Sequence, residues 1–363
     1  MSIELTDVVK SFKSETVLDG LSLSVAKGET LVLFGPSGAG KTVLLRLIAG
    51  VIDPEEGQIV VNGIDMDGVE PEDRGIGMAF QNFALFPHMD AHANIASPLT
   101  ARRKTKEGIG SRVSEVAKLL KIEHVLGHKP KELSNGQKQR TALGRALAAE
   151  PSILLLDDPL RNVDAKLRFE MRLELPRLLK AQEATVIYVT QDYKEAMALG
   201  DRIAVMNEQG IAQVGSPEEI YLTPANTRIA CLFGDPAINL LDVVPQEGVS
   251  GPEVHLSGAR VPLDPGYAQA VGRDCTLGVR PEAIRFAEPY AAGALPVEIE
   301  AETPLNEKTV TLAATQAQRE ILISRPAGTT APDRGTAHIA IDAAGVHLFD
   351  RATGTRIQPG DDT

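Results

Sequence analysis

The sequence predicts an α/β domain followed by a smaller β-rich domain, and two changes of pattern along the chain support this. In residues 1–235, apolar strand-like runs alternate with turns and helical patterns, which is typical of α/β folds. The run Thr30–Phe34, for example, leads into a glycine-rich turn and then a helical pattern that ends at Gly50. After about Phe233, glycine and proline become frequent and short strand-like runs recur, so residues 236–363 are predicted to form the second domain.

The middle of the first domain, about residues 90–150, is predicted to be a helical subdomain. Apolar residues recur there at the spacing of one helix face, namely at Val113, Val116, Ala117 and Leu120. Three apolar, partly β-branched runs follow at Ile153–Leu156, Thr185–Val189 and Arg202–Met206. Such runs suit the buried parallel strands of an α/β sheet.

The composition limits the classes of partner and location. The 363 residues carry a net charge of −12, which argues against general nucleic-acid binding because such proteins usually have a basic surface. No stretch reaches the roughly 18 apolar residues that suggest a membrane span, and the N-terminus lacks the apolar core of a signal peptide. We therefore expect a cytoplasmic chain that has no nucleic-acid partner and reaches a membrane only by docking onto other subunits.

A phosphate-binding loop is the clearest motif in the sequence. Eight residues fit the pattern G-x-x-x-x-G-K-[ST]: Gly35, Pro36, Ser37, Gly38, Ala39, Gly40, Lys41 and Thr42. The glycines allow backbone N–H groups to turn toward phosphate oxygens, and the helix that follows directs its N-terminus at the same anion. Lys41 adds a positive charge near the β- and γ-phosphates, and the Thr42 hydroxyl can bind Mg²⁺. The strand before the loop and the helix after it match the context that this motif requires.

Two acids follow the apolar run that begins at Ile153. Strand ends in open α/β sheets face the ligand crevice, so Asp157 is predicted to hold Mg²⁺ and Asp158 to address an attacking water molecule. Without the phosphate loop, the same pair could equally be an ordinary turn at a strand end.

The stretch Leu133–Arg140, with the sequence LSNGQKQR, resembles the signature of ABC ATPases. The resemblance covers about the first 235 residues and implies a RecA-like P-loop NTPase fold that binds ATP and Mg²⁺. It also implies roles for single residues. Phe12 would stack on adenine, Gln81 would sense Mg²⁺ and the attacking water, and Asp164 would belong to the D-loop. Gln191 stands where the family has its switch histidine.

In this family two ATPase subunits close head to tail, so that each ATP lies between one phosphate loop and the partner's signature. The resemblance therefore implies that four residues face the partner's ATP, namely Ser134, Asn135, Gly136 and Gln137. Their position at the start of a predicted helix suits that role, because a helix N-terminus favours phosphate. Ser134 is also expected to act as an ordinary helix cap.

Three further segments, PEDRGIGMAFQNFALFPHM (71–89), GDPAINLL (234–241) and LGVRPEAIRF (277–286), resemble the maltose-type sugar importer ATPases most closely. The last two resemble the C-terminal OB-like domain of that subgroup, called TOBE. This resemblance implies a peripheral position at the cytoplasmic face of the inner membrane. Expected partners are two permease subunits, docking near Phe83–Met89, and indirectly an extracytoplasmic solute-binding protein. The cargo is expected to be a sugar, a polyol, glycerol or glycerol phosphate.

The sequence departs from the family pattern at the sites of hydrolysis. Asp158 stands in place of a glutamate, Gln191 in place of the histidine, and Asn135 in place of a glycine, while Arg161 opens the D-loop where serine is common. A carboxylate displaced by about 1 Å can cost on the order of 100-fold in rate, and glutamine cannot carry a proton. We therefore expect weak hydrolysis and pairing with a different ATPase. A homodimer for another solute, and a mainly ATP-holding regulatory subunit, remain as alternatives.

Overall fold

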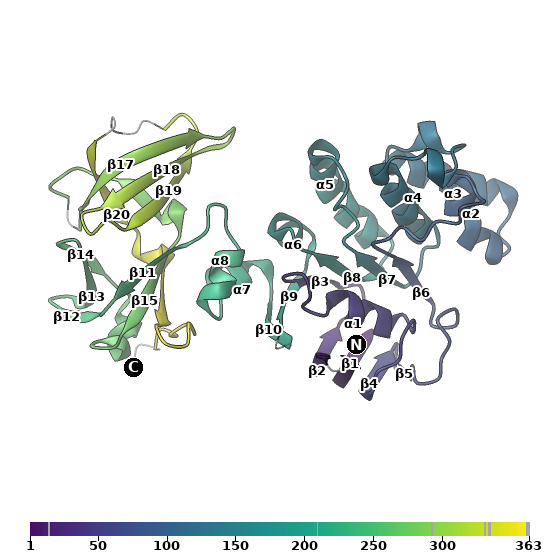
Figure 1. Cartoon of the computed structure of the whole chain (residues 1–363), viewed down its shortest axis with the longest axis horizontal. Coiled ribbons are helices and arrows are strands. Elements are labelled where there is room, and N and C mark those ends of the chain that lie inside the picture. Colours follow the sequence, from purple (N-terminus) through teal and green to yellow (C-terminus); the bar gives the residue numbers. More distant parts are fainter. Residues whose placement is uncertain (14, 209, 292, 330–331, 333–334, 361–363) are drawn as a thin grey trace. The chain divides into compact units, whose positions relative to one another are not determined.

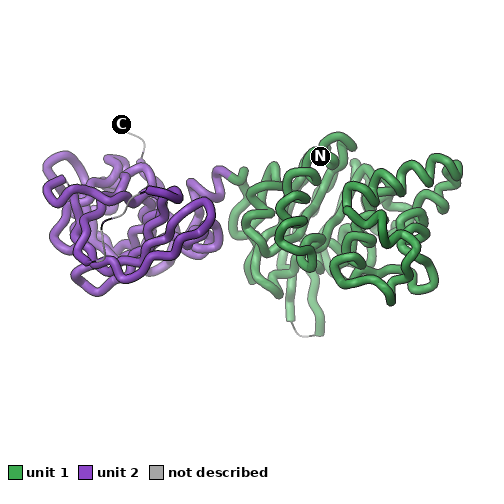
Figure 2. The backbone as a smooth tube through the Cα atoms, turned by 90° about the horizontal axis from the view of Figure 1, so that it is seen from above, with its two compact units in different colours: residues 1–217 green, residues 218–363 purple. Residues whose placement is uncertain are grey.

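The computed structural model describes residues 1–13, 15–208, 210–291, 293–329, 332 and 335–360. The chain divides into two compact units, Met1–Pro217 and Glu218–Thr363, shown in different colours in Figure 2. None of the helices described is long and apolar enough to cross a membrane.

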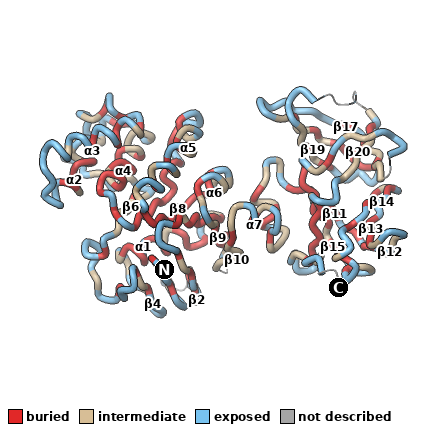
Figure 3. The backbone as a smooth tube through the Cα atoms, turned by 180° about the vertical axis from the view of Figure 1, so that it is seen from behind, coloured by how far each residue is buried: buried red, intermediate tan, exposed pale blue. Residues whose placement is uncertain are grey.

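A six-stranded sheet forms the centre of the first unit, in the order β10-β9-β3-β8-β7-β6 (Figure 1). Its pairs are parallel except for the hairpin of β9 with β10. Every residue of β7 and β8 is buried, as expected for parallel strands covered on both faces (Figure 3). The strands are β3 Thr30–Phe34, β6 Ile76–Ala79, β7 Ile153–Asp157, β8 Thr185–Thr190, β9 Arg202–Asn207 and β10 Gly210–Gly215.

A second, antiparallel sheet of the first unit has the order β2-β1-β4-β5. Its apolar side chains share one core with helix α1 and with strands of the central sheet. The helix that follows β3 is thereby held between the two sheets. These strands are β1 Ile3–Phe12, β2 Glu15–Val25, β4 Glu56–Val61 and β5 Ile64–Asp65, and α1 is Lys41–Ile48.

Three α-helices, α2 (Ala91–Ala101), α3 (Lys106–Leu119) and α4 (Asn135–Ala148), occupy the middle of the first unit. The 3₁₀ turns η1 (Glu123–Val125) and η2 (Pro130–Glu132) connect α3 to α4. The helix face predicted from apolar spacing is confirmed, because each of its members is at most 1% exposed: Val113, Val116, Ala117 and Leu120. Two further helices of this unit, α5 (Ala165–Ala181) and α6 (Tyr193–Leu199), follow β7 and β8.

The second unit is rich in strands, as the sequence predicts. Its described residues form three sheets, β11-β15-β21, β12-β13-β14 and β16-β20-β17-β18-β19. The 3₁₀ turns η3 Pro265–Ala270, η4 Pro281–Ala283 and η5 Ala343–Gly345 connect some of the strands. The strands are β11 Asn239–Val243, β12 Gln246–Gly248, β13 Gly251–Leu256, β14 Ala259–Pro262, β15 Cys275–Val279, β16 Ile284–Phe286, β17 Leu295–Pro304, β18 Lys308–Thr315, β19 Glu320–Pro326, β20 Thr336–Ile341 and β21 Val346–Asp350.

The division between the units lies earlier than residue 235, the boundary expected from the sequence. Helix α8 (Thr227–Leu232) and nearly all of α7 (Pro217–Leu222) belong to the second unit. Buried Arg280 is one of the residues that join these helices to the second unit, since its guanidinium donates hydrogen bonds to backbone carbonyls at the ends of both helices. The donors reach Ala230 O at 2.9 Å and Tyr221 O at 2.7 Å, and the guanidinium also lies 4.0 Å from the Tyr221 ring centroid.

Candidate functional site

The loop between β3 and α1 has, at three glycines, a positive φ that residues with side chains rarely adopt. Gly35, Gly38 and Gly40 have φ values of 155°, 89° and 82°. A Cβ atom on Gly35 would lie 2.3 Å from the carbonyl oxygen of Met206, and one on Gly40 would lie 2.8 Å from the Leu18 side chain. The loop therefore brings its N–H groups together in a shape that side chains at these positions would prevent.

Lys41, the first residue of α1, is held inside this loop. Its Nζ donates hydrogen bonds to Gly35 O at 2.8 Å and Pro36 O at 2.6 Å. Burial lowers the pKa of its ammonium group, while the negative charges of Asp157 and Asp158 oppose that shift. The cation is thus fixed at the place where a bound phosphate would meet the loop.

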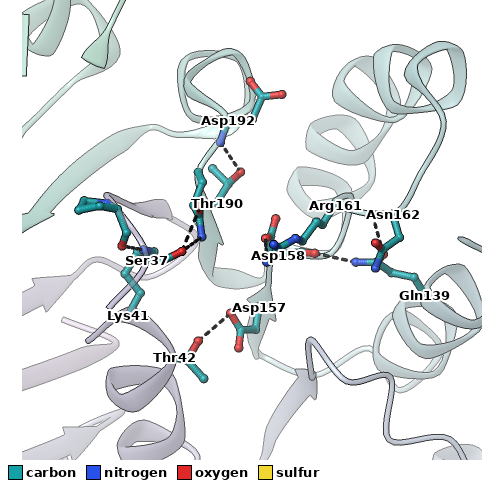
Figure 4. A network of polar contacts seen from close by, with 12 residues as sticks. Ser37, Lys41, Thr42, Gln139, Asp157, Asp158, Arg161, Asn162, Thr190 and Asp192 are labelled. Carbon is teal, nitrogen blue, oxygen red and sulfur yellow. Dashed lines mark hydrogen bonds and ion pairs between the residues drawn. The ribbon is translucent and has the colours of Figure 1, made fainter. Parts of the chain in front are cut away.

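Thr42 and Asp157 meet beneath the loop. The Thr42 hydroxyl donates a hydrogen bond to Asp157 Oδ1 over 3.2 Å (Figure 4). Asp157 ends β7 and is only 3% exposed, and burial raises its pKa, which the bond from Thr42 partly offsets. Together with Gln81, which lines the same cavity, these residues offer a hydroxyl, a carboxylate and an amide oxygen. Such hard oxygen ligands fit Mg²⁺.

A cavity of about 430 Å³ joins the loop to the ends of β7 and β8. It brings together most of the residues that the sequence assigned to ATP, Mg²⁺ and hydrolysis. The described residues that line it are Glu15, Val17, Ser37, Gly38, Gly40, Lys41, Thr42, Val43, Gln81, Asp157, Asp158, Arg161, Val189 and Gln191.

Three of the four departures from the family pattern, Asp158, Arg161 and Gln191, line this cavity. Asp158 has a φ of 50° and is 9% exposed, and burial raises the pKa of its carboxyl group while the nearby charge of Arg161 acts in the opposite direction. The Gln191 amide donates to Ser37 Oγ over 3.2 Å, so this neutral side chain is tied to the phosphate loop.

Phe12, predicted to stack on adenine, does not line the cavity itself. It ends β1 and pairs across the hairpin with Glu15, which does line the cavity. Its ring is 45% exposed, and Lys10 Nζ lies 5.7 Å from the ring centroid. An exposed ring beside the cavity is available for stacking, and that role stays a prediction.

The signature residues lie at the start of α4, outside the set that lines the phosphate cavity. Ser134 accepts a hydrogen bond from Gln137 N, and the Gln137 side chain accepts one from Ser134 N, so both complete a capping box. Ser134 and Asn135 are exposed, and a Cβ on Gly136 would lie 2.8 Å from the carbonyl oxygen of Asn162. Ser134 thus caps the helix, and the exposed end of α4 remains open to a partner.

Asp164 of the predicted D-loop caps the next helix. Its carboxylate accepts a hydrogen bond from Leu167 N at the start of α5, and that bond holds the Asp164 pKa below its usual value.

The turn from Asp158 to Asn162 is joined to α4 through Gln139, a buried residue to which the sequence alone assigns no role. Gln139 Nε2 donates to Asp158 O at 2.6 Å, and its Oε1 accepts from Asn162 N at 2.9 Å. The only signal in the sequence is that Gln139 lies within the signature-like stretch Leu133–Arg140, two positions after Gln137.

The segment Phe83–Met89, predicted to receive permease subunits, borders a groove of about 530 Å³ beside α2 and α4. Arg145 donates to Ala84 O at 2.7 Å and lies 5.4 Å from the ring centroid of Phe86. Phe86 is 42% exposed and lines the groove. An exposed aromatic residue held by an arginine is the kind of feature found at protein interfaces.

Comparison with known protein families gives two matches. The family model described as "ABC transporter" matches residues 18–161, and the model described as "MalK OB fold domain" matches residues 234–284. The first match includes the phosphate loop, the signature and Asp158. The second lies within the strand-rich unit.

Comparison with individual proteins extends the similarity to almost the whole chain. The sn-glycerol-3-phosphate import ATP-binding protein UgpC of Escherichia coli K12 is 41% identical over 360 residues, which are 98% of this chain and 99% of the relative. The protein of the same name from Cereibacter sphaeroides is 40% identical over 355 residues, again 98% and 99% of the two chains. Among solved structures, the dimeric ATP-binding cassette MJ0796 bound to ADP and Pi has a TM-score of 0.56 at 30% identity. The match covers 59% of this chain and 98% of the MJ0796 chain.

Proposed function

The chain belongs to the ABC transporter family as the ATP-binding subunit of a maltose-type importer, and on that premise we propose how its cavity binds and splits ATP. The cavity at the end of β7 carries the proposal, because loop, cation, Mg²⁺ ligands and strand-end acid all line it. The glycine loop and Lys41 bind the phosphates. Phe12 is available for the adenine ring.

Mg²⁺, when bound, neutralises charge on the phosphates. Thr42, Asp157 and Gln81 would hold it, and they supply the oxygen ligands that the ion prefers. Burial raises the pKa of Asp157, and a divalent cation beside it would lower that pKa again, so Mg²⁺ binding and deprotonation of Asp157 would favour each other.

Asp158 is the proposed base for hydrolysis. The oxygen of a water molecule forms a bond to the γ-phosphorus while the bond from phosphorus to the bridging oxygen of ADP breaks. The water proton passes to the Asp158 carboxylate and leaves with phosphate. Gln191, tied to Ser37, would donate a hydrogen bond to the γ-phosphate without carrying charge.

Pairing of two cassettes is proposed from the position of the signature. The exposed start of α4, with Ser134 and Asn135, lies outside the phosphate cavity of its own chain. A second cassette turned head to tail would bring this helix end to its ATP, since helix N-termini bind phosphate. Pairing with a different ATPase was expected from Asp158 and Gln191, and none of the comparisons supports it.

The cargo proposed is glycerol phosphate or a similar small polyhydroxylated solute. The support is the full-length similarity to proteins named for sn-glycerol-3-phosphate import. Two permease subunits would dock at the groove beside Phe83–Met89, and the chain would then lie peripherally at the cytoplasmic face of the inner membrane. An extracytoplasmic binding protein would present the solute.

The test uses the transporter purified through an affinity tag on this chain and reconstituted in lipid vesicles. We expect the binding protein loaded with sn-glycerol 3-phosphate to stimulate ATP hydrolysis and uptake. Stimulation by maltose alone would reassign the solute, and absence of any ATP-dependent uptake would refute the motor function. Mass spectrometry of the same complex reports its cassettes: one species means a homodimer, and two species mean a different partner ATPase.

A further inference from the structure

Two cationic side chains, those of Lys41 and Arg161, occur among the described residues that line the ATP cavity. Three acids line the same cavity, namely Glu15, Asp157 and Asp158. The local charge is therefore poorly suited to a polyanionic substrate unless cations act on its terminal phosphate. Gln191 lines this cavity without contributing charge.

The position of the Arg161 side chain suits that task. Its Nη1 lies 3.7 Å from Asp158 Oδ2, and the two residues lie side by side in Figure 4. The Arg161 side chain is 52% exposed and that of Asp158 only 12%, so the cation stands at the open side of the carboxylate. Lys41, by contrast, donates to two carbonyl oxygens of the loop.

The turn that carries Arg161 is fixed from both sides. Gln139 binds Asp158 O and Asn162 N, which flank it. From α5, Arg168 donates to Arg161 O at 2.9 Å, so the backbone of Arg161 is also held directly. A guanidinium presented from a turn held this way loses less freedom when it binds phosphate than one on a loose loop.

We propose that Arg161 is a catalytic residue whose guanidinium contacts the terminal phosphate of ATP bound in the same chain. The inference rests on the proposed function, since it requires ATP in this cavity. Arginine suits the role because its planar fork binds phosphate oxygens in pairs and stays charged. As the γ-phosphate separates from ADP, the guanidinium stabilises the charge on its oxygens.

The test compares Arg161→Ser and Arg161→Lys in the purified full transporter. Arginines that contact a transferring phosphate can contribute about 1,000-fold or more, and for this half-exposed side chain we expect Arg161→Ser to lower kcat about 30-fold. Arg161→Lys should recover part of the loss. ATP affinity and melting temperature should change little, because the contact strengthens in the transition state. Arg177→Ser is the matched control: Arg177 lies on α5, 77% exposed, and pairs with Glu174.

A second readout separates phosphate contact from mere pairing with Asp158. Orthovanadate with ADP mimics the transferring phosphate, and we expect Arg161→Ser to weaken its binding at least about 10-fold both in the native chain and in Asp158→Asn. An unchanged kcat, or an effect that vanishes in Asp158→Asn, would overturn the proposal. If the unmutated transporter neither binds nor hydrolyses ATP, the proposed function itself fails, which is a different result from an inert Arg161.

Discussion

The two sides of the ATP cavity are built by different means. On the phosphate-loop side, backbone geometry sets the site, since Gly35 and Gly40 leave no room for a Cβ and Lys41 is bound by the loop itself. On the other side, a turn from Asp158 to Asn162 is held by side chains from α4 and α5. The departures from the family pattern at Asp158, Arg161 and Gln191 all lie on or next to this second side. On the proposed function, the backbone of the loop sets ATP binding, whereas single side chains on the turn side tune hydrolysis.

Replacing Lys41 tests the loop side and should have the largest effect. Lys41→Ala removes the cation that the loop holds, and loss of one preorganised electrostatic group typically costs about 100- to 1,000-fold in kcat. We expect ATP hydrolysis by the purified transporter to fall by about 1,000-fold and ATP affinity to weaken as well. Lys27→Ala, at an exposed position in the same unit, is the control and should leave both unchanged. A loss below about 10-fold would show that the loop side does not dominate.

Replacing Asp158 tests the turn side, and pH is the sharper readout. Only the carboxylate accepts a proton, so Asp158→Asn should lower kcat by about 100-fold. Burial raises the pKa of Asp158, so in the native chain kcat should fall on acidification at a higher pH than a free aspartate titrates. The same acid limb should be absent in Asp158→Asn.

The matched variant for this residue is Asp158→Glu, which lengthens the side chain by one methylene. We expect its kcat to equal or exceed that of the native chain, since it brings the carboxylate nearer to the γ-phosphate. An acid limb that persists in Asp158→Asn would assign the base to another group.

The sequence predicts the loop side far better than the turn side. The loop motif is contiguous, and the contact between Thr42 and Asp157 follows from two parallel strands, β3 and β7, which flank β8 and end at the same edge of the sheet. The sequence does not predict the role of Gln139, because its two hydrogen-bond partners lie 19 and 23 residues away. No local pattern indicates that a glutamine in a helix connects that helix to a distant turn.

The division of the chain into two compact units depends on contacts of the same long-range kind. Arg280 binds carbonyls 47 to 59 residues earlier in the chain, and this contact helps to join α8 to the second unit. Helix periodicity and turn residues report local structure, whereas pairings of this kind depend on the completed fold.

Replacing Gln139 should have the smallest effect of the three and tests how the turn is held. Gln139→Leu keeps the volume but removes the partner of Asn162 N and one of the two donors to Asp158 O, which keeps its bond from Arg161 N; this costs about 1–3 kcal/mol in the free energy of unfolding. If the turn positions Asp158 and Arg161, kcat should fall by about 10-fold while ATP affinity, set by the loop side, stays the same. Gln182→Leu is the control, because the Gln182 side chain makes no hydrogen bond within the described part of the chain. Denaturant unfolding and steady-state kinetics measure the two effects separately. Equal losses in kcat and in ATP affinity would mean that a change in the turn also alters the phosphate loop. The two sides of the cavity would then be structurally coupled, and the contrast between them would no longer hold.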